Sequence, residues 1–200
     1  IEFATPGHPY VLDKTKGDVY DRKLLNARVR VYGDDIAAIV AVDSVAANRA
    51  ARLIRVEYEE YAPLLSVEAA LAPDALPLHP SVRDTNLLAH SSYVVGTGTY
   101  AQAKADEPDL IEVEGEYGTQ AVQHCHLEPV QSYAYMEGSR FTVVSSTQIP
   151  HIVRRVVGQA LGIPWAQVRI IKPYIGGGFG NKQDVLYEPL NAFLCQLVGG

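Results

Sequence analysis

Apolar residues in the first third of the chain follow patterns that predict regular structure. An apolar run over residues 36–42 predicts a strand, and residues 54–58 alternate apolar and polar side chains, which is typical of a half-buried strand. Between them, apolar residues recur at helical spacing over 45–53, after Ser44, a residue type that caps helices. A strand, a helix and a strand of this combined length predict a βαβ unit.

Farther along, apolar and aromatic residues predict strands at 110–117, 130–135, 141–145 and 168–171. Residues 1–26 show no such pattern, and the prolines and glycine of residues 6–9 predict a turn.

Helices are predicted around these strands. A short helix covers residues 66–71. A longer amphipathic helix follows Thr147, which can act as its N-cap, and it carries Pro150 in the first turn, where proline is tolerated. Gly162 and the proline that follows two residues later end this helix.

The loop between the strand at 168–171 and a last helix, which begins near Asp184 or Glu188, is rich in glycine. Its sequence IGGGFGNKQ places four glycines in five positions around Phe179. Glycine backbone approaches other atoms closely and adopts φ angles that other residues avoid. This density is typical of a loop that lies against a ligand, and a ligand-free turn at a helix entry is the alternative.

The glycine loop does not fit two common nucleotide-binding patterns. A P-loop requires Gly-Lys followed by Ser or Thr, whereas Asn181 separates Gly180 from Lys182 and Gln183 replaces the hydroxyl. The dinucleotide fingerprint G-x-G-x-x-G would require a glycine in place of Asn181. The loop therefore indicates a ligand other than a nucleotide phosphate.

The segment GTQAVQHCHLEPV gathers His124, Cys125, His126 and Glu128. Imidazole, thiolate and carboxylate groups are zinc ligands, and on a strand the two histidines and the glutamate would share one face. No second Cys/His cluster at ligand spacing accompanies them, which favours buried hydrogen bonds beside a pocket over metal ligation. A catalytic role for Cys125 is disfavoured, because on a strand both imidazoles would point away from its thiol.

Composition and charge narrow the function classes. The 200 residues suffice for one large domain or two small ones, and 48% hydrophobic and 20% charged residues are typical of a globular protein. The net charge of −6 disfavours nucleic acid or an anionic membrane surface as a partner, and no apolar run reaches the roughly 18 residues of a membrane helix. With two cysteines and no recognisable signal peptide, we expect a cytoplasmic protein, and both ends of the sequence suggest a longer polypeptide.

Three linked stretches resemble the large subunits of the xanthine dehydrogenase and aldehyde oxidase family, the molybdenum hydroxylases. SSTQIPHIVRRVVGQALGIPWAQVRIIKPYIGGGFGNKQ resembles the family's T-Q-x-P helix start, L-G-I-P helix end and G-G-G-F-G-x-K loop. HCHLEP resembles the family's H-x-x-L-E-P element, and residues 29–71 look like the end of its α/β hammerhead domain. The resemblance implies an α+β fold, in which the C-terminal part of a hammerhead domain (1–72) is followed by a linker (73–90) and the truncated start of a molybdenum-cofactor-binding domain (91–200).

The resemblance also implies a molybdenum ion held by the dithiolene of molybdopterin. Gln148 of T-Q-x-P would hydrogen-bond an oxygen ligand of the metal, and Gly178, Phe179 and Gly180 would lie against the cofactor, with Gln148 and Phe179 in contact with the metal's ligand sphere. Backbone N–H groups of a glycine loop can reach an oxo group, and an amide side chain donates without titrating. The family's glutamate base lies farther along the polypeptide, so we expect no catalytic residue among these residues and no activity from them alone.

The family hydroxylates a heteroaromatic ring or an aldehyde with oxygen derived from water. Gln183 stands where animal xanthine oxidoreductases carry a purine-contacting glutamate, so Gln183 would contact substrate without a charge. NKQDVLYEPL resembles bacterial members, which implies a purine hydroxylase, the cytosine dinucleotide form of the cofactor, and separate subunits with FAD and [2Fe-2S] clusters in an oligomer of heterotrimers. The alternatives are hydroxylation of an aldehyde or of an N-heterocycle such as nicotinate, and a cofactor-free binding or assembly module.

Overall fold

The computed structural model describes residues 2–5, 19–80, 84–87, 90, 92–93, 95–96, 98–107 and 109–200. The chain divides into a larger unit, formed by residues 1–86 and 124–200, and a smaller unit, residues 87–123. Within the described ranges, every helix is too short or too polar to span a lipid bilayer.

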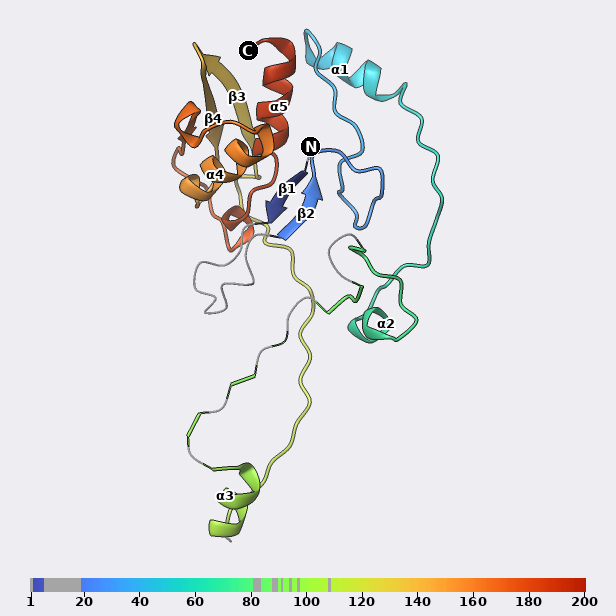
Figure 1. Ribbon diagram of the computed structural model, residues 1–200, viewed down its shortest axis with the longest axis vertical. Helices are drawn as coiled ribbons and strands as arrows, with labels where there is room; N and C mark the ends of the chain where they lie inside the picture. The colour runs from blue at the N-terminus through green and yellow to red at the C-terminus, as the bar shows by residue number, and fades with distance from the viewer. Residues whose placement is uncertain are drawn as a thin grey trace. The chain divides into compact units, whose positions relative to one another are not determined.

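A three-stranded sheet and two helices form the core of the larger unit (Figure 1). The strands lie in the order β3 (Ser132–Glu137), β4 (Arg140–Ser145) and β5 (Val168–Ile171). β3 pairs antiparallel with β4, and β5 runs parallel to β4, so the chain between β4 and β5 must cross over the sheet. Helix α4 (Pro150–Leu161) and the 3₁₀ turn η1 (Trp165–Gln167) make that crossover, and helix α5 (Glu188–Val198) packs against α4 and β3.

Helix α4 confirms the predicted amphipathic helix. Pro150 occupies its first turn, and Gly162 ends it in the left-handed conformation, with φ of 66°. The predicted cap is wrong, because Thr147 Oγ1 accepts from the N–H of Ile149 at 3.0 Å and no side chain caps the helix. The helix buries one apolar stripe in the core, made of Val153, Val156, Val157 and Ala160.

The other elements of this core also follow the sequence. β5 has the predicted bounds, and α5 begins at Glu188, one of the two predicted starts. β4 begins one residue before its predicted start, and β3 begins two residues after its predicted start. The two strands pair from Ser132 opposite Ser145 to Glu137 opposite Arg140, on either side of the turn that joins them.

Three predicted strands are wrong. Residues 36–42, 54–58 and 110–117 are all described, and none of them pairs with another described segment. Alternation of apolar side chains reports a preference for burial, but a strand also needs a neighbour that takes up its backbone hydrogen bonds. Without one the apolar side chains are open to solvent, as Val42 shows at 96% exposed. The βαβ unit is therefore wrong as well.

Two predicted helices of the first half do form. Helix α1 (Ser44–Ala51) is capped by Asp43 rather than Ser44, because the Asp43 carboxylate accepts from the N–H of Ala46 at 2.7 Å. Helix α2 (Val67–Leu71) follows Ser66, whose hydroxyl accepts from the N–H of Ala69 at 3.1 Å. The sequence placed both helices within two residues of their observed ends.

The sequence analysis missed three elements. Strands β1 (Glu2–Thr5) and β2 (Val19–Lys23) pair antiparallel in the larger unit, and helix α3 (Tyr100–Asp106) lies in the smaller unit. Thr99 and Gln102 form a capping box at the start of α3, a local signal that the sequence contains. The predicted turn at 6–9 and parts of the predicted linker lie outside the described residues, and the domain boundaries stay predictions.

Candidate functional site

The glycine loop leaves β5, reverses direction and enters the 3₁₀ turn η2 (Asn181–Gln183). Its backbone adopts left-handed conformations at Gly177, Phe179 and Gly180, with φ of 91°, 47° and 93°. A positive φ is uncommon for an aromatic residue and marks a constrained backbone. The Phe179 side chain is 73% exposed, so burial of its ring does not account for this conformation.

Two of the glycines lie in close packing contacts. A Cβ atom at position 176 would lie 2.7 Å from Cβ of Glu128, and one at position 178 would overlap the side-chain amide of Gln148. The loop therefore lies directly against two segments that precede it in the chain. The structure brings Gln148 and Gly178, two of the predicted cofactor contacts, close together, and their contact with a cofactor stays a prediction.

A partly buried ion pair holds the loop against the upstream segment. The Lys182 side chain is 0% exposed, and its Nζ lies 2.6 Å from Oε2 of Glu128. The same carboxylate oxygen accepts from the N–H of Gly176 at 2.8 Å, and the N–H of Glu128 donates to the carbonyl of Gly176 at 3.2 Å. The Lys182 ammonium, followed by the Gly176 N–H, holds the pKa of Glu128 below its usual value.

The loop and Gln148, two residues before α4, together present hydrogen-bond donors. The N–H of Gln148 donates to the carbonyl of Lys182 at 2.8 Å, which fixes its backbone, while its side chain is exposed. In the described part of the chain, neither the Gln148 amide nor the N–H groups of Phe179 and Gly180 have a hydrogen-bond partner. Unpartnered donors on a left-handed loop beside a neutral amide fit the oxygen atoms of a bound cofactor.

The histidine and cysteine segment is not a strand. Cys125 has φ of 48°, which breaks the alternation that would put His124, His126 and Glu128 on one face. His126 Nε2 lies 2.9 Å from Nδ2 of Asn181, so this histidine contacts the end of the glycine loop. The described residues contain no group of three side chains that could hold a metal ion.

Gln183, the predicted substrate contact, lies at the end of η2 with an exposed side chain, and its N–H donates to the carbonyl of Gly180 at 3.1 Å. Its role in substrate binding stays a prediction.

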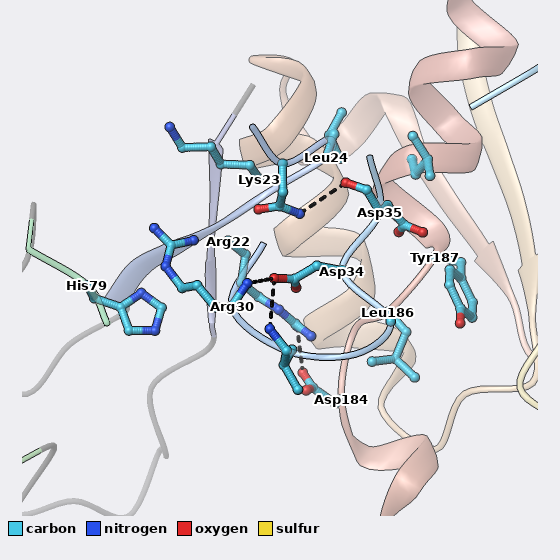
Figure 2. Close-up of a pocket in the computed structure, with 14 residues that line it drawn as sticks. Arg22, Lys23, Leu24, Arg30, Asp34, Asp35, His79, Asp184, Leu186 and Tyr187 are labelled. Carbon is cyan, nitrogen blue, oxygen red and sulfur yellow. Dashed lines mark hydrogen bonds and ion pairs between the residues drawn. The ribbon is translucent and has the colours of Figure 1, made fainter. Parts of the chain in front are cut away.

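Sequence reasoning missed the contacts that anchor the far end of the loop. Arg22 Nη1 donates to Oδ1 of Asp184 at 3.1 Å (Figure 2). The same nitrogen donates to the carbonyl of Val185 at 2.6 Å. Arg22 and Asp184 are 162 positions apart, and no local pattern joins them. They line a pocket of about 350 Å³ that carries both signs of charge, and none of its lining residues belongs to the predicted cofactor site.

Two family models match the chain. One describes a molybdopterin cofactor-binding domain and matches residues 78–200, and the other describes the a/b hammerhead domain of aldehyde oxidase and xanthine dehydrogenase and matches residues 5–62. The chain belongs to the xanthine dehydrogenase and aldehyde oxidase family. This confirms the fold class, a hammerhead domain followed by a molybdenum-cofactor-binding domain of mixed helices and sheet.

Relatives within this family differ in what their names say they act on. The chain is 53% identical over 201 residues to a putative xanthine dehydrogenase molybdenum-binding subunit of Escherichia coli (strain K12), covering 100% of this chain and 26% of that protein. It is 36% identical over 165 residues to the nicotinate dehydrogenase large molybdopterin subunit of Eubacterium barkeri, covering 81% of this chain and 37% of that protein. The chain thus spans about a quarter of the length of the xanthine dehydrogenase relative.

A solved member of the family has the same fold. The aldehyde oxidoreductase from Desulfovibrio gigas superposes with a TM-score of 0.83 at 26% sequence identity, over 100% of this chain and 22% of that chain. The chain therefore shares its fold with a molybdenum enzyme of known structure.

Proposed function

We propose that this chain forms part of the molybdenum-binding subunit of a hydroxylase that acts on a purine such as hypoxanthine or xanthine. One observation carries the proposal: the side-chain amide of Gln148 packs against Gly178, next to the unpartnered N–H groups of Phe179 and Gly180. When bound there, the molybdenum–molybdopterin cofactor would supply the redox chemistry that converts a C–H bond into a C–OH bond with oxygen from water.

The chain's own residues would bind and orient. Gln148 would donate from its neutral amide to an oxygen of the cofactor, which works at any physiological pH because an amide does not titrate. Phe179 and Gly180 would donate from a backbone that is already in the required conformation, so little reorganisation accompanies binding. Gly178 would keep these donors together, since any side chain there would displace Gln148.

The choice of a purine rests on similarity and on Gln183. The chain shares 53% identity with a relative named a xanthine dehydrogenase subunit. An exposed glutamine both donates and accepts, which suits the alternating donors and acceptors along the edge of a purine ring. The relatives named nicotinate dehydrogenase and aldehyde oxidoreductase make hydroxylation of nicotinate or of an aldehyde the second candidate.

The proposed enzyme includes further components. We propose the cytosine dinucleotide form of molybdopterin, partner subunits with FAD and [2Fe-2S] clusters, assembly as an oligomer of heterotrimers, and a cytoplasmic location. The proposed domain boundaries are 1–72 and 91–200, with 73–90 as the linker.

The test is to produce the full-length subunit with its partner subunits in a host that makes the cofactor, and to assay hypoxanthine, xanthine, nicotinate and an aldehyde. We expect molybdenum and pterin in the purified protein and the highest kcat/KM with a purine. Protein from a host unable to synthesise the cofactor serves as the control and should be inactive. A higher kcat/KM with nicotinate or the aldehyde would overturn the substrate, and absence of molybdenum and pterin would support a cofactor-free module instead.

A further inference from the structure

Lys182 is the largest of the fully buried side chains in the described part of the chain. Lysine is almost never fully buried without a partner, because its charge loses hydration. Its partner here is Glu128, with 2.6 Å between Nζ and Oε2. Such a pair often contributes no more stability than apolar residues of similar volume, so a gain in stability alone does not explain a buried lysine at this position.

The side chain of Lys182 connects two segments of the site. Glu128 receives the Lys182 ammonium and the N–H of Gly176 on the same oxygen, at 2.6 and 2.8 Å. A Cβ atom at position 176 would lie 2.7 Å from Cβ of Glu128, so only glycine allows this close approach. The start of the glycine loop is therefore held at the position that the ion pair sets.

The backbone of Lys182 connects the glycine loop to the segment that contains Gln148. Its carbonyl accepts from the N–H of Gln148 at 2.8 Å. Lys182 is thus bonded through its side chain to the Glu128 segment and through its main chain to Gln148. The backbone of Gln148 is thereby tied to that of Lys182, and the Gln148 amide occupies the space that a Cβ atom of residue 178 would need.

We infer that Lys182 is a positioning residue, which sets the distance between the Gln148 amide and the donors of the glycine loop by means of its ion pair with Glu128. Lys182 does not touch the reacting atoms in this scheme. The catalytic consequence rests on the proposed function, because only a bound cofactor makes the position of those donors matter. The structural consequence, a loop held in place by the ion pair, does not depend on it.

The experiment compares Lys182→Met with Lys172→Met in the full-length subunit assembled with its partners. Lys172 is exposed just after β5 and has no hydrogen-bond partner among the described residues, so the control makes the same substitution without breaking a contact. The first measurement is hydrogen–deuterium exchange of the peptide that spans 174–187 in cofactor-free protein. We expect at least tenfold faster exchange in Lys182→Met and the wild-type rate in Lys172→Met.

The second measurement is a kinetic cycle with Gln148→Ala in the cofactor-containing enzyme. We expect Lys182→Met to lower kcat by about a hundredfold, the effect of a displacement of about 1 Å in a positioned group, with KM changed by less than about threefold. Because Lys182 acts through Gln148, the double variant should lose little beyond Gln148→Ala alone. If Lys182→Met does not fold, Glu128→Gln removes the charge of the partner while keeping its shape, and the same results are expected of it.

The outcomes separate the two proposals. Wild-type exchange in the loop of both Lys182→Met and Glu128→Gln would overturn the positioning role, whatever the cofactor content. The positioning role would also be overturned if the fold losses of kcat in the two single variants multiplied in the double variant. Such losses mean that the changes in activation free energy add, as they do for independent residues. If the purified wild-type protein contained no molybdenum, the proposed function would be wrong. The exchange measurement would still decide the role of Lys182.

Discussion

The side-chain amide of Gln148 occupies the space that a Cβ atom of residue 178 would need. This contact joins the segment before α4 to the glycine loop after β5, and it brings together two groups that would face the cofactor. The glycine at 178 is needed for space, because its φ is not in the left-handed region, unlike those of Gly177 and Gly180.

Replacing Gly178 with alanine should therefore displace Gln148 without straining the backbone. We expect at least a tenfold loss of kcat with molybdenum content unchanged in the full-length enzyme, measured by steady-state kinetics and elemental analysis. Gly118→Ala is the matched control, since a Cβ at 118 meets no atom within 4 Å and φ there is not positive. Equal activity of the two variants would show that the contact has no functional role.

Removing the Gln148 amide tests the donor itself. Loss of one preorganised donor costs about 10²–10³-fold in kcat when it stabilises developing charge, so we expect Gln148→Ala to fall in this range with molybdenum content unchanged. Gln167→Ala, at an exposed glutamine of η1, should keep wild-type kcat. A Gln148→Ala enzyme with wild-type kcat would contradict the role given to this residue.

The ion pair of Glu128 with Lys182 makes part of the stability depend on pH. The pKa of Glu128 lies below its ordinary value of 4.5, so the folded state binds this proton less tightly than the unfolded state does. The stabilising contribution is fully present above about pH 5 and is lost as pH falls through the lowered pKa. Thermal unfolding between pH 7 and pH 3 should show a smaller acid-induced decrease of Tm in Glu128→Gln than in wild type. Parallel curves would show that another carboxylate dominates the acid response.

Local contacts explain which parts of the fold the sequence predicts. Strands β3 and β4 pair across a short turn, and α4 links β4 to β5, so the apolar pattern and the turn residues suffice to locate these elements. Helix α5 packs against the distant strand β3, and its own apolar pattern locates it. The pattern fails at 36–42, 54–58 and 110–117, because it reports which side chains favour burial and not whether a pairing strand lies alongside.

Within the site, too, some features were predicted from the sequence and others were not. Gln148 and the glycine loop were predicted from linked motifs, and the structure places them in contact. The burial of Lys182 was not predicted, since lysine is normally a surface residue and its partner lies 54 positions away. Cys125 was expected to extend a strand, and only the structure shows the left-handed backbone that turns His126 toward Asn181.

Arg22 anchors the chain that follows the glycine loop, and its loss should destabilise that region. The partly exposed ion pair with Asp184 is worth at most about 1 kcal/mol, and the hydrogen bond to the carbonyl of Val185 adds about 1 kcal/mol. We expect Arg22→Ala to lower the free energy of unfolding by about 1–2 kcal/mol in urea denaturation of the domain that contains it. Arg52→Ala, at an exposed arginine after α1, should change it by less than about 0.5 kcal/mol. Equal effects of the two substitutions would rule out the anchor.

Gln183 is the residue through which substrate choice can be tested within this chain. Its exposed amide would make about one hydrogen bond to a purine, and losing such a bond changes binding by about 0.5–1.5 kcal/mol, or up to about tenfold in kcat/KM. We therefore expect Gln183→Ala to lower kcat/KM for the preferred purine by about two- to tenfold and to leave that for a small aldehyde nearly unchanged, because an aldehyde has no ring edge to contact. Gln183→Glu should alter kcat/KM among purines according to whether each presents a donor or an acceptor, since a carboxylate only accepts. If Gln183→Ala lowered kcat/KM equally for the purine and the aldehyde, this residue would stabilise the loop rather than recognise the substrate.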